Sequence, residues 1–179
     1  MSIEITGVGQ LKEDATYGML SSREIPVHIL GGHPCRFLLE GYEDDSAPED
    51  FHEAIVRFVA ARPEVLIAAS SYVHAYYLDV LALTAPPELT GDPVLAVADI
   101  WTQVQFGREA IVSRRDSGDR SIYISLTCGC EWEPEHGLEI VFSDEPAVVK
   151  IGPFDGHLTN SDAYGDARLE GVIYKSLAA

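Results

Sequence analysis

Apolar and polar side chains alternate with a period of two between residues 121 and 132. The apolar positions are Ile122, Ile124, Leu126, Cys128, Cys130 and Trp132. This period places them on one face of a strand and the intervening residues on the other. The alternation resumes at Leu138, Ile140 and Phe142, after a short loop that ends at Gly137. Two such runs predict an antiparallel hairpin with its tip at residues 133–137, where Gly137 takes a positive φ.

The middle of the chain changes to spacings of three and four residues, which are typical of helices. Ser46-Ala47-Pro48-Glu49 has the form of a capping box. It precedes an apolar stripe of Phe51, Ile55, Phe58 and Val59. A second helix is predicted from Pro63 to a stop at Ala85-Pro86-Pro87. Its apolar face consists of Leu66, Ala69, Val73, Tyr76, Val80 and Leu83.

Shorter apolar runs predict strands on both sides of these helices. The strands are expected at residues 3–5, 17–20, 25–30, 35–42, 109–114, 147–151 and 172–175. Asp92-Pro93 predicts the start of a short helix, and Asn160 or Ser161 the cap of another. In the first short helix, Val94, Val97, Trp101 and Val104 share one face. The order of strands, helices and strands predicts one α+β domain over residues 1–179, with an antiparallel sheet (N-terminal meander plus C-terminal hairpins) packed by two central helices.

Charge narrows the range of partners. The chain has 12 basic and 29 acidic residues, a net charge of −17. Such a charge repels nucleic acid and anionic membranes, and it attracts a basic protein partner. It is equally compatible with a role in solubility alone. Four of the arginines lie at Arg108, Arg114, Arg115 and Arg120, where we expect an ion pair with the acidic hairpin tip or a small cationic patch.

The sequence also bears on the compartment. No basic segment followed by an apolar one opens the chain, so we expect no signal peptide. The apolar stretch from 64 to 85 contains Glu64, His74 and Asp79, and it suits a buried helix better than a membrane span. Three cysteines, an odd number, favour a reducing compartment. The cytoplasm is the simplest localisation.

Two turns carry residues suited to acid–base chemistry. Alternate turns of consecutive hairpins lie at the same end of a sheet, so the hairpin tip and the Asp155-Gly156-His157 turn are expected together. The candidate catalytic residues are Glu133, Glu135, His136, Asp155 and His157. A carboxylate orients an imidazole that titrates near neutrality, as general acid–base catalysis requires. A structural interpretation competes, in which the two histidines hydrogen-bond across the turns and lock them together.

Zinc is the specific form of a metal hypothesis. Cys128, Cys130 and His136 are the candidate ligands, with His33 and Cys35 available from another strand. Along a regular strand, however, the two sulfur atoms of a Cys-x-Cys pair lie about 6–7 Å apart, too far to share one zinc ion without a bulge at Gly129. Buried thiols that continue the apolar face are therefore expected, and no cofactor is predicted.

Several motifs together resemble a known family. These are Trp101-Thr102-Gln103-Val104, the arginine-rich turn, the segment from Cys130 to Leu138, and Asp155-Gly156-His157-Leu158-Thr159. In this order they are similar to a family of bacterial domains of unknown function, marked by a Trp-Asp/Glu-x-Glu-His-Gly-Leu hairpin and a later Asp-Gly-His turn. The resemblance covers about residues 93 to 165. It is shared with small acidic proteins beside bacterial toxin systems, and therefore implies an interaction or immunity-type role.

Three functions remain open on the sequence. The first is a non-enzymatic acidic interaction protein of immunity type. The second is a small metal-dependent or acid–base hydrolase that uses the His136 and His157 cluster. The third is a ligand-binding module in which Tyr72, Tyr76 and Tyr77 line a pocket. We favour the first.

Overall fold

A computed structural model describes residues 3–84 and 94–177. Its strands are β1 (Glu4–Ile5), β2 (Gly9–Gln10), β3 (Lys12–Asp14), β4 (Met19–Ser21), β5 (Ile25–Val27), β6 (His33–Glu40), β7 (Val104–Gln105), β8 (Glu109–Arg114), β9 (Ile122–Cys130), β10 (Leu138–Ser143) and β11 (Val148–Gly152). Its α-helices are α1 (Glu49–Ala60), α2 (Glu64–Thr84) and α3 (Asn160–Tyr164). Its 3₁₀ turns are η1 (His28–Leu30), η2 (Tyr42–Asp44), η3 (Val97–Gln103) and η4 (Ala167–Leu169).

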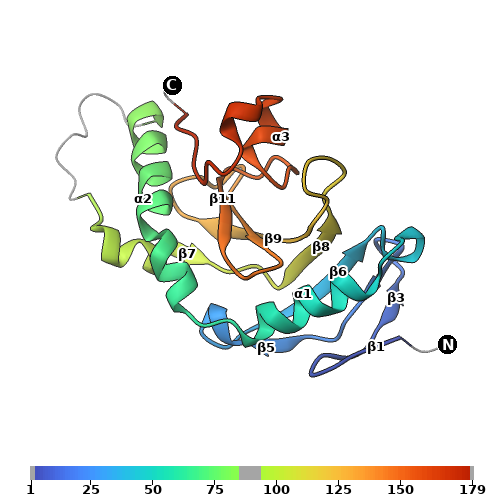
Figure 1. Cartoon of the computed structure of the whole chain (residues 1–179). Helices are drawn as coiled ribbons and strands as arrows, with labels where there is room; N and C mark the ends of the chain where they lie inside the picture. The colour runs from blue at the N-terminus through green and yellow to red at the C-terminus, as the bar shows by residue number, and fades with distance from the viewer. Residues whose placement is uncertain (1–2, 85–93, 178–179) are drawn as a thin grey trace.

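The main sheet has the strand order β11-β10-β9-β8-β6-β4-β3 (Figure 1). Short β5 extends the pairing of β6, and β7 extends that of β9. Among the described strands, the pairing of β6 with β8 is parallel, with Leu38 opposite Ile111, and the other pairings are antiparallel. The α+β prediction is confirmed, although the parallel pair joins the two predicted halves of the sheet in a way that we did not expect.

The hairpin predicted from the alternation forms as β9 and β10. Leu138 pairs with Cys128, and Ile140 pairs with Leu126. The side chains of the predicted apolar face are buried from Ile122 to Cys130. Gly137 has a φ of +65°, and a Cβ there would lie 2.5 Å from the carbonyl oxygen of Cys128. Both the positive φ and the close approach explain why glycine ends the tip.

The two long helices pack against one face of the sheet. Phe58 of α1 meets Phe37 of β6 and Phe142 of β10, with ring centroids 6.0 Å and 4.9 Å apart. Helix α2 buries Val73, Tyr76 and Val80, as its spacing predicts. Edge-to-face ring contacts of this kind add to the burial of apolar area. This face of the sheet, with both helices, forms the hydrophobic core.

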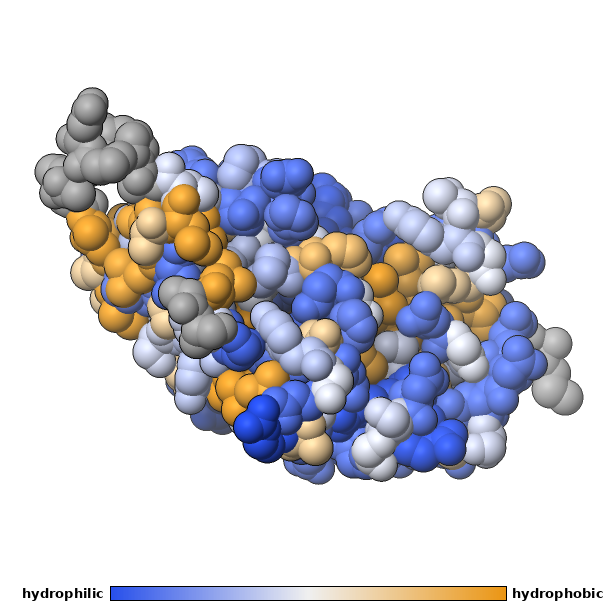
Figure 2. Space-filling model, turned by 90° about the horizontal axis from the view of Figure 1, so that it is seen from above, coloured by the Kyte–Doolittle hydropathy of each residue, from blue (hydrophilic) through white to orange (hydrophobic). Residues whose placement is uncertain are grey.

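Helix α2 also has an exposed apolar side. Ile67 is 65% exposed and Leu83 is 62% exposed, so the prediction that Leu83 faces the core is wrong. Figure 2 shows apolar residues gathered at the end of the molecule that α2 and the segment before η3 form. By length and composition α2 is the one described helix able to cross a membrane, and 39% of its most apolar window is buried in the protein.

Three other local predictions are wrong. The predicted capping box at residues 46–49 does not form, because the N-cap of α1 is Pro48 and no side chain caps the helix. In this segment it is the Asp45 carboxylate that binds the backbone, accepting from the Ala47 N–H at 2.8 Å. Val94 precedes the 3₁₀ helix η3 and Val104 lies in β7, so the four predicted residues do not share the face of one helix. Residues 172–175 form no strand, although the Ile173 carbonyl accepts from the Ile151 N–H of β11 at 2.7 Å and the Asn160 amide donates to the carbonyls of residues 172 and 173. The predicted stop at residues 85–87 and the start at 92–93 lie outside the described residues.

Candidate functional site

The face of the sheet opposite the helices carries a groove that runs along β8. Strands β6, β8 and β9 supply its floor. The floor side chains are Arg36, Leu38, Glu40, Glu109, Ile111, Ser113, Ser125 and Thr127. These residues occupy the positions between the core-facing ones, so the alternation that builds the core also places this second, mixed set on the opposite face, where Leu38, Ser113 and Ser125 are themselves buried.

Two adjoining hollows make up the groove, with volumes of about 830 and 1030 Å³. They meet at Ile111 and Ser125, which line both. The N-terminal segment from Tyr17 to Glu24 walls the first hollow, and residues 154–165 wall the second. We call them the neutral half and the acidic half, for the charges described next.

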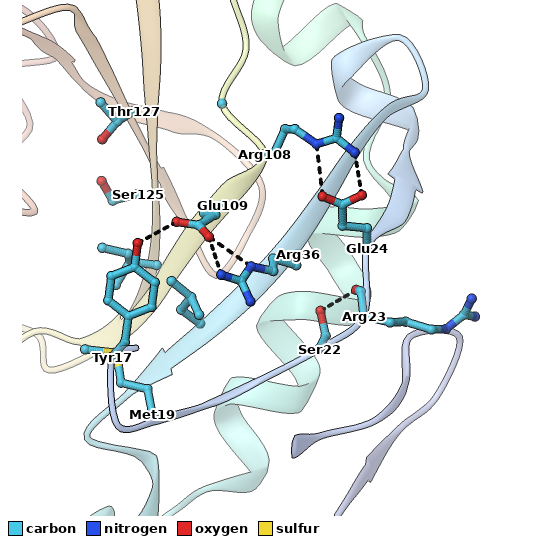
Figure 3. A pocket seen from close by; sticks show the side chains of 13 residues that line it. Tyr17, Met19, Ser22, Arg23, Glu24, Arg36, Arg108, Glu109, Ser125 and Thr127 are labelled. Carbon is cyan, nitrogen blue, oxygen red and sulfur yellow. Dashed lines mark hydrogen bonds and ion pairs between the residues drawn. The ribbon is translucent and has the colours of Figure 1, made fainter. Parts of the chain in front are cut away.

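Two of the three arginines in the neutral half pair with carboxylates (Figure 3), whereas Arg23 donates to the Val8 carbonyl at 3.1 Å. Arg36 donates to Asp14 at 2.6 Å and through Nε to Glu109 at 2.9 Å. Glu109 also accepts from the Tyr17 hydroxyl, and Arg108 binds Glu24 from the rim. The Arg36 guanidinium lowers the pKa of Asp14, and the Glu109 carboxylate raises the pKa of Tyr17. The Arg108 guanidinium likewise lowers the pKa of Glu24.

Arginine pairs also organise the acidic half. Arg114 at the end of β8 donates to Asp45 and Asp50, both at 2.7 Å. Hydrogen bonds from Arg114 lower the pKa of Asp45. The prediction that this arginine cluster pairs with the acidic hairpin tip is therefore wrong, because the segment from Asp45 to the first turn of α1 and the region of α3 supply the carboxylates at the end of β8.

Arg115 continues this pattern towards α3. It binds Asp162 through Nε at 2.8 Å and Nη2 at 2.9 Å, and it binds Glu170 through Nη1 at 2.7 Å. Its hydrogen bonds lower the pKa values of both carboxyl groups. Bidentate contacts with a planar guanidinium hold α3 and η4 against the end of the sheet.

Negative charge is left over in the acidic half. Among the described residues, six carboxyl groups and three arginines line it. Glu40, Asp44 and Asp116 are exposed, and their carboxyl groups have no hydrogen bond or ion pair within 3–84 and 94–177. Arg120 is likewise without an ion pair in that part of the chain, so three carboxylates face one guanidinium. This half of the groove is suited to cationic groups.

A buried ion pair supports the floor of the acidic half. Lys150 donates to Glu139 at 2.7 Å, and the two side chains are 1% and 2% exposed. Lys150 also donates to Asp155 at 2.5 Å and to the carbonyl oxygen of His157 at 2.8 Å, while Ser125 donates to Glu139 at 2.8 Å. All three protons of the ammonium group are thereby satisfied, and the turn at residues 153–157 is fixed to β11.

The two predicted turns lie together, since the Phe154 N–H donates to the His136 carbonyl at 3.3 Å. At the hairpin tip, one potential ligand atom from each of Glu133, Glu135 and His136 lies within 4.8 Å of the others. In the other turn, Asp155 lies 3.4 Å from Nδ1 of His157.

The side chains of the two turns form separate local groups. The imidazoles of His136 and His157 are 54% and 47% exposed, each beside a carboxylate of its own turn. The link between the turns is therefore a backbone hydrogen bond and not an imidazole lock. His157 lines the acidic half, whereas His136 lies outside both hollows.

The cysteines are buried thiols. Cys35, Cys128 and Cys130 are free and buried. Burial raises the pKa of Cys35 and of Cys128 to about 12, and that of Cys130 to about 11. Within the described residues, Cys128 and Cys130 do not join His136 in a group with metal-ligand spacing. The tyrosine-rich side of α2 lines neither hollow.

Sequence reasoning missed the groove. Lys150 is a single charge in the apolar run Val148-Val149-Lys150-Ile151, and Glu139 is another inside β10. A lone charge within a buried strand signals a paired partner. Glu40, Asp44 and Asp116 carry no such local signal, because their common location depends on the parallel pairing of β6 with β8.

Comparison with known proteins supplies a family. The model of a family described as Domain of unknown function (DUF6985) matches residues 7–158. The chain belongs to this family. The match begins well before the resemblance at 93–165, and it includes β3, β4 and the whole neutral half of the groove. No curated protein and no solved structure matches the chain.

Proposed function

We propose that this protein is a non-enzymatic interaction protein, of immunity type, whose acidic surface binds a basic protein partner. The observation that carries the proposal is the internal use of its cations. Within residues 3–84 and 94–177, at least seven of the 12 basic residues form ion pairs with carboxylates of the same chain. The 29 acidic residues therefore leave a large excess that is available to an external cation.

Long-range attraction between opposite surfaces accelerates association and depends on ionic strength. The Debye length is about 10 Å at 0.1 M salt and about 3 Å at 1 M. We expect the tagged chain to capture a basic protein from lysate at low salt and to release it as the salt concentration rises. Capture of an acidic partner, or of a partner that remains fully bound at 1 M salt, would contradict the proposal.

A second candidate, a metal-dependent hydrolase that binds zinc, is favoured by one observation. Potential ligand atoms of Glu133, Glu135 and His136 lie within 4.8 Å of one another at the hairpin tip. Carboxylate oxygen and imidazole nitrogen are both zinc ligands. Calorimetric titration with zinc chloride separates the candidates. Stoichiometric zinc binding that the substitution His136→Ala abolishes, together with zinc-dependent hydrolysis of a model ester, would favour the hydrolase. If the protein is an interaction protein, the His136→Ala variant should still bind its partner.

A further inference from the structure

The groove has the length of a short extended peptide. It follows β8 from Gly107 in the neutral half to Arg115 in the acidic half. An extended chain advances about 3.3 Å per residue, so these positions accommodate about eight residues of peptide. Because β8 pairs on both sides, with β6 and β9, its backbone offers no free edge, and a ligand must be recognised by side chains.

The two halves differ in what they recognise. Both carboxylates that line the neutral half have internal arginine partners, Glu109 with Arg36 and Glu24 with Arg108. In the acidic half, Glu40, Asp44 and Asp116 are unmatched. Phe154, 46% exposed, lies on the wall of that half. The methylene stem of a lysine packs on an aromatic ring, and its ammonium group binds carboxylates.

We propose that the groove binds an extended, lysine-rich segment of the partner protein along β8, with its ammonium groups in the acidic half. This inference rests on the proposed function and adds to it the location and the class of ligand. The two hollows follow one another along β8, the first walled by residues 17–24 and the second by residues 154–165. A flexible basic segment can follow this course along the strand.

The test uses a fluorescein-labelled octapeptide of alternating lysine and alanine, measured by fluorescence anisotropy at low salt. The site variant is Glu40→Gln with Asp44→Asn and Asp116→Asn. The matched control is Glu4→Gln with Asp99→Asn and Glu131→Gln, whose carboxylates lie outside both hollows. Each triple substitution neutralises three carboxylates, so both variants carry a net charge of about −14 and any effect of overall charge is the same in both.

We expect the site variant to weaken binding by roughly tenfold, because three exposed ion pairs each contribute about twofold. The control variant should change the affinity by less than about twofold. A tetrapeptide of the same composition fills only one half, and it should bind roughly tenfold more weakly than the octapeptide. The corresponding glutamate–alanine octapeptide should not bind.

Two results would overturn the inference. Equal weakening by both triple variants would show that binding is spread over the whole acidic surface. Wild-type protein that fails to bind the octapeptide but still captures a basic partner in a salt-sensitive manner would place the interaction elsewhere. In both cases the proposed function stands, whereas loss of every salt-sensitive basic partner removes the function itself.

Discussion

Lys150 donates to Glu139 across neighbouring strands, and both side chains are almost completely withdrawn from solvent. Taking two charges out of water costs free energy that the pair recovers only with good geometry and further hydrogen bonds. Here Asp155, Ser125 and the His157 carbonyl provide those hydrogen bonds. The floor of the acidic half is therefore sensitive to the removal of either partner.

Replacing Lys150 with Met should lower the free energy of unfolding by about 3–5 kcal/mol, because Glu139 is left charged and buried. The double variant Lys150→Met with Glu139→Leu should recover most of this loss, since both charges are then removed. Urea unfolding followed by circular dichroism measures each value. Additive losses in the double variant would show that the two residues act independently.

Arg115 should be the most important arginine for holding α3. Its side chain is 3% exposed, whereas Asp162 and Glu170 are 24% and 53% exposed. Arg115→Met should destabilise the fold by about 2 kcal/mol, less than a fully buried pair because water solvates the two carboxylates. Arg168→Gln removes a 90% exposed guanidinium and is the control, with little expected effect. Chemical denaturation of the two variants tests this difference.

Stability should fall at acid pH. Arg36, Arg114 and Arg115 lower the folded-state pKa values of Asp14, Asp45 and Asp162, each from an ordinary value of 3.8. A lowered pKa contributes stability that is present above the unfolded value and is lost as the pH falls through the folded one. We expect unfolding free energy to decline below about pH 4.

Asp45→Asn should flatten this acid dependence, while Glu64→Gln, a carboxyl group with no partner within the described residues, should leave it unchanged. Denaturation midpoints between pH 2 and pH 7 provide the comparison. An identical slope for Asp45→Asn and the wild type would contradict the role of the Arg114 pair.

The three thiols should be inert in the native protein. Burial raises the pKa of each one, so the reactive thiolate is scarce at pH 8. Ellman's reagent should modify less than one thiol per chain quickly, and all three after denaturation. Rapid modification of native Cys130, the most exposed of the three, would contradict its placement under the hairpin tip.

Local periodicity correctly predicted the elements that have one buried face. The alternation from Ile122 to Phe142 correctly gave β9, β10 and their buried face, and the stripe from Phe51 gave α1. The short strand expected at Ile3 and Ile5 is β1, whereas β2 and β3 have too few residues to establish a period. The predicted strand at 172–175 did not form: the segment makes one backbone hydrogen bond to β11, from the Ile151 N–H to the Ile173 carbonyl, and the Asn160 side chain binds two of its carbonyl groups.

The candidate site was less predictable for a physical reason. Residues of one hairpin are neighbours in sequence, so the tip with Glu133 and His136 could be found from the chain alone. The groove instead depends on pairings between distant segments, such as Arg36 with Glu109. A polar position on a strand indicates only that a side chain faces away from the core, and not which other segments surround it.

The parallel pair at the centre of the sheet has a consequence for biosynthesis. Arg36 and Glu109, which face each other across β6 and β8, are 73 residues apart in sequence. During translation one edge of β6 therefore stays unpaired until β8 has left the ribosome. We expect the nascent chain to depend on chaperone protection during that interval, and its refolding to be slower than that of proteins of similar size with mostly local contacts.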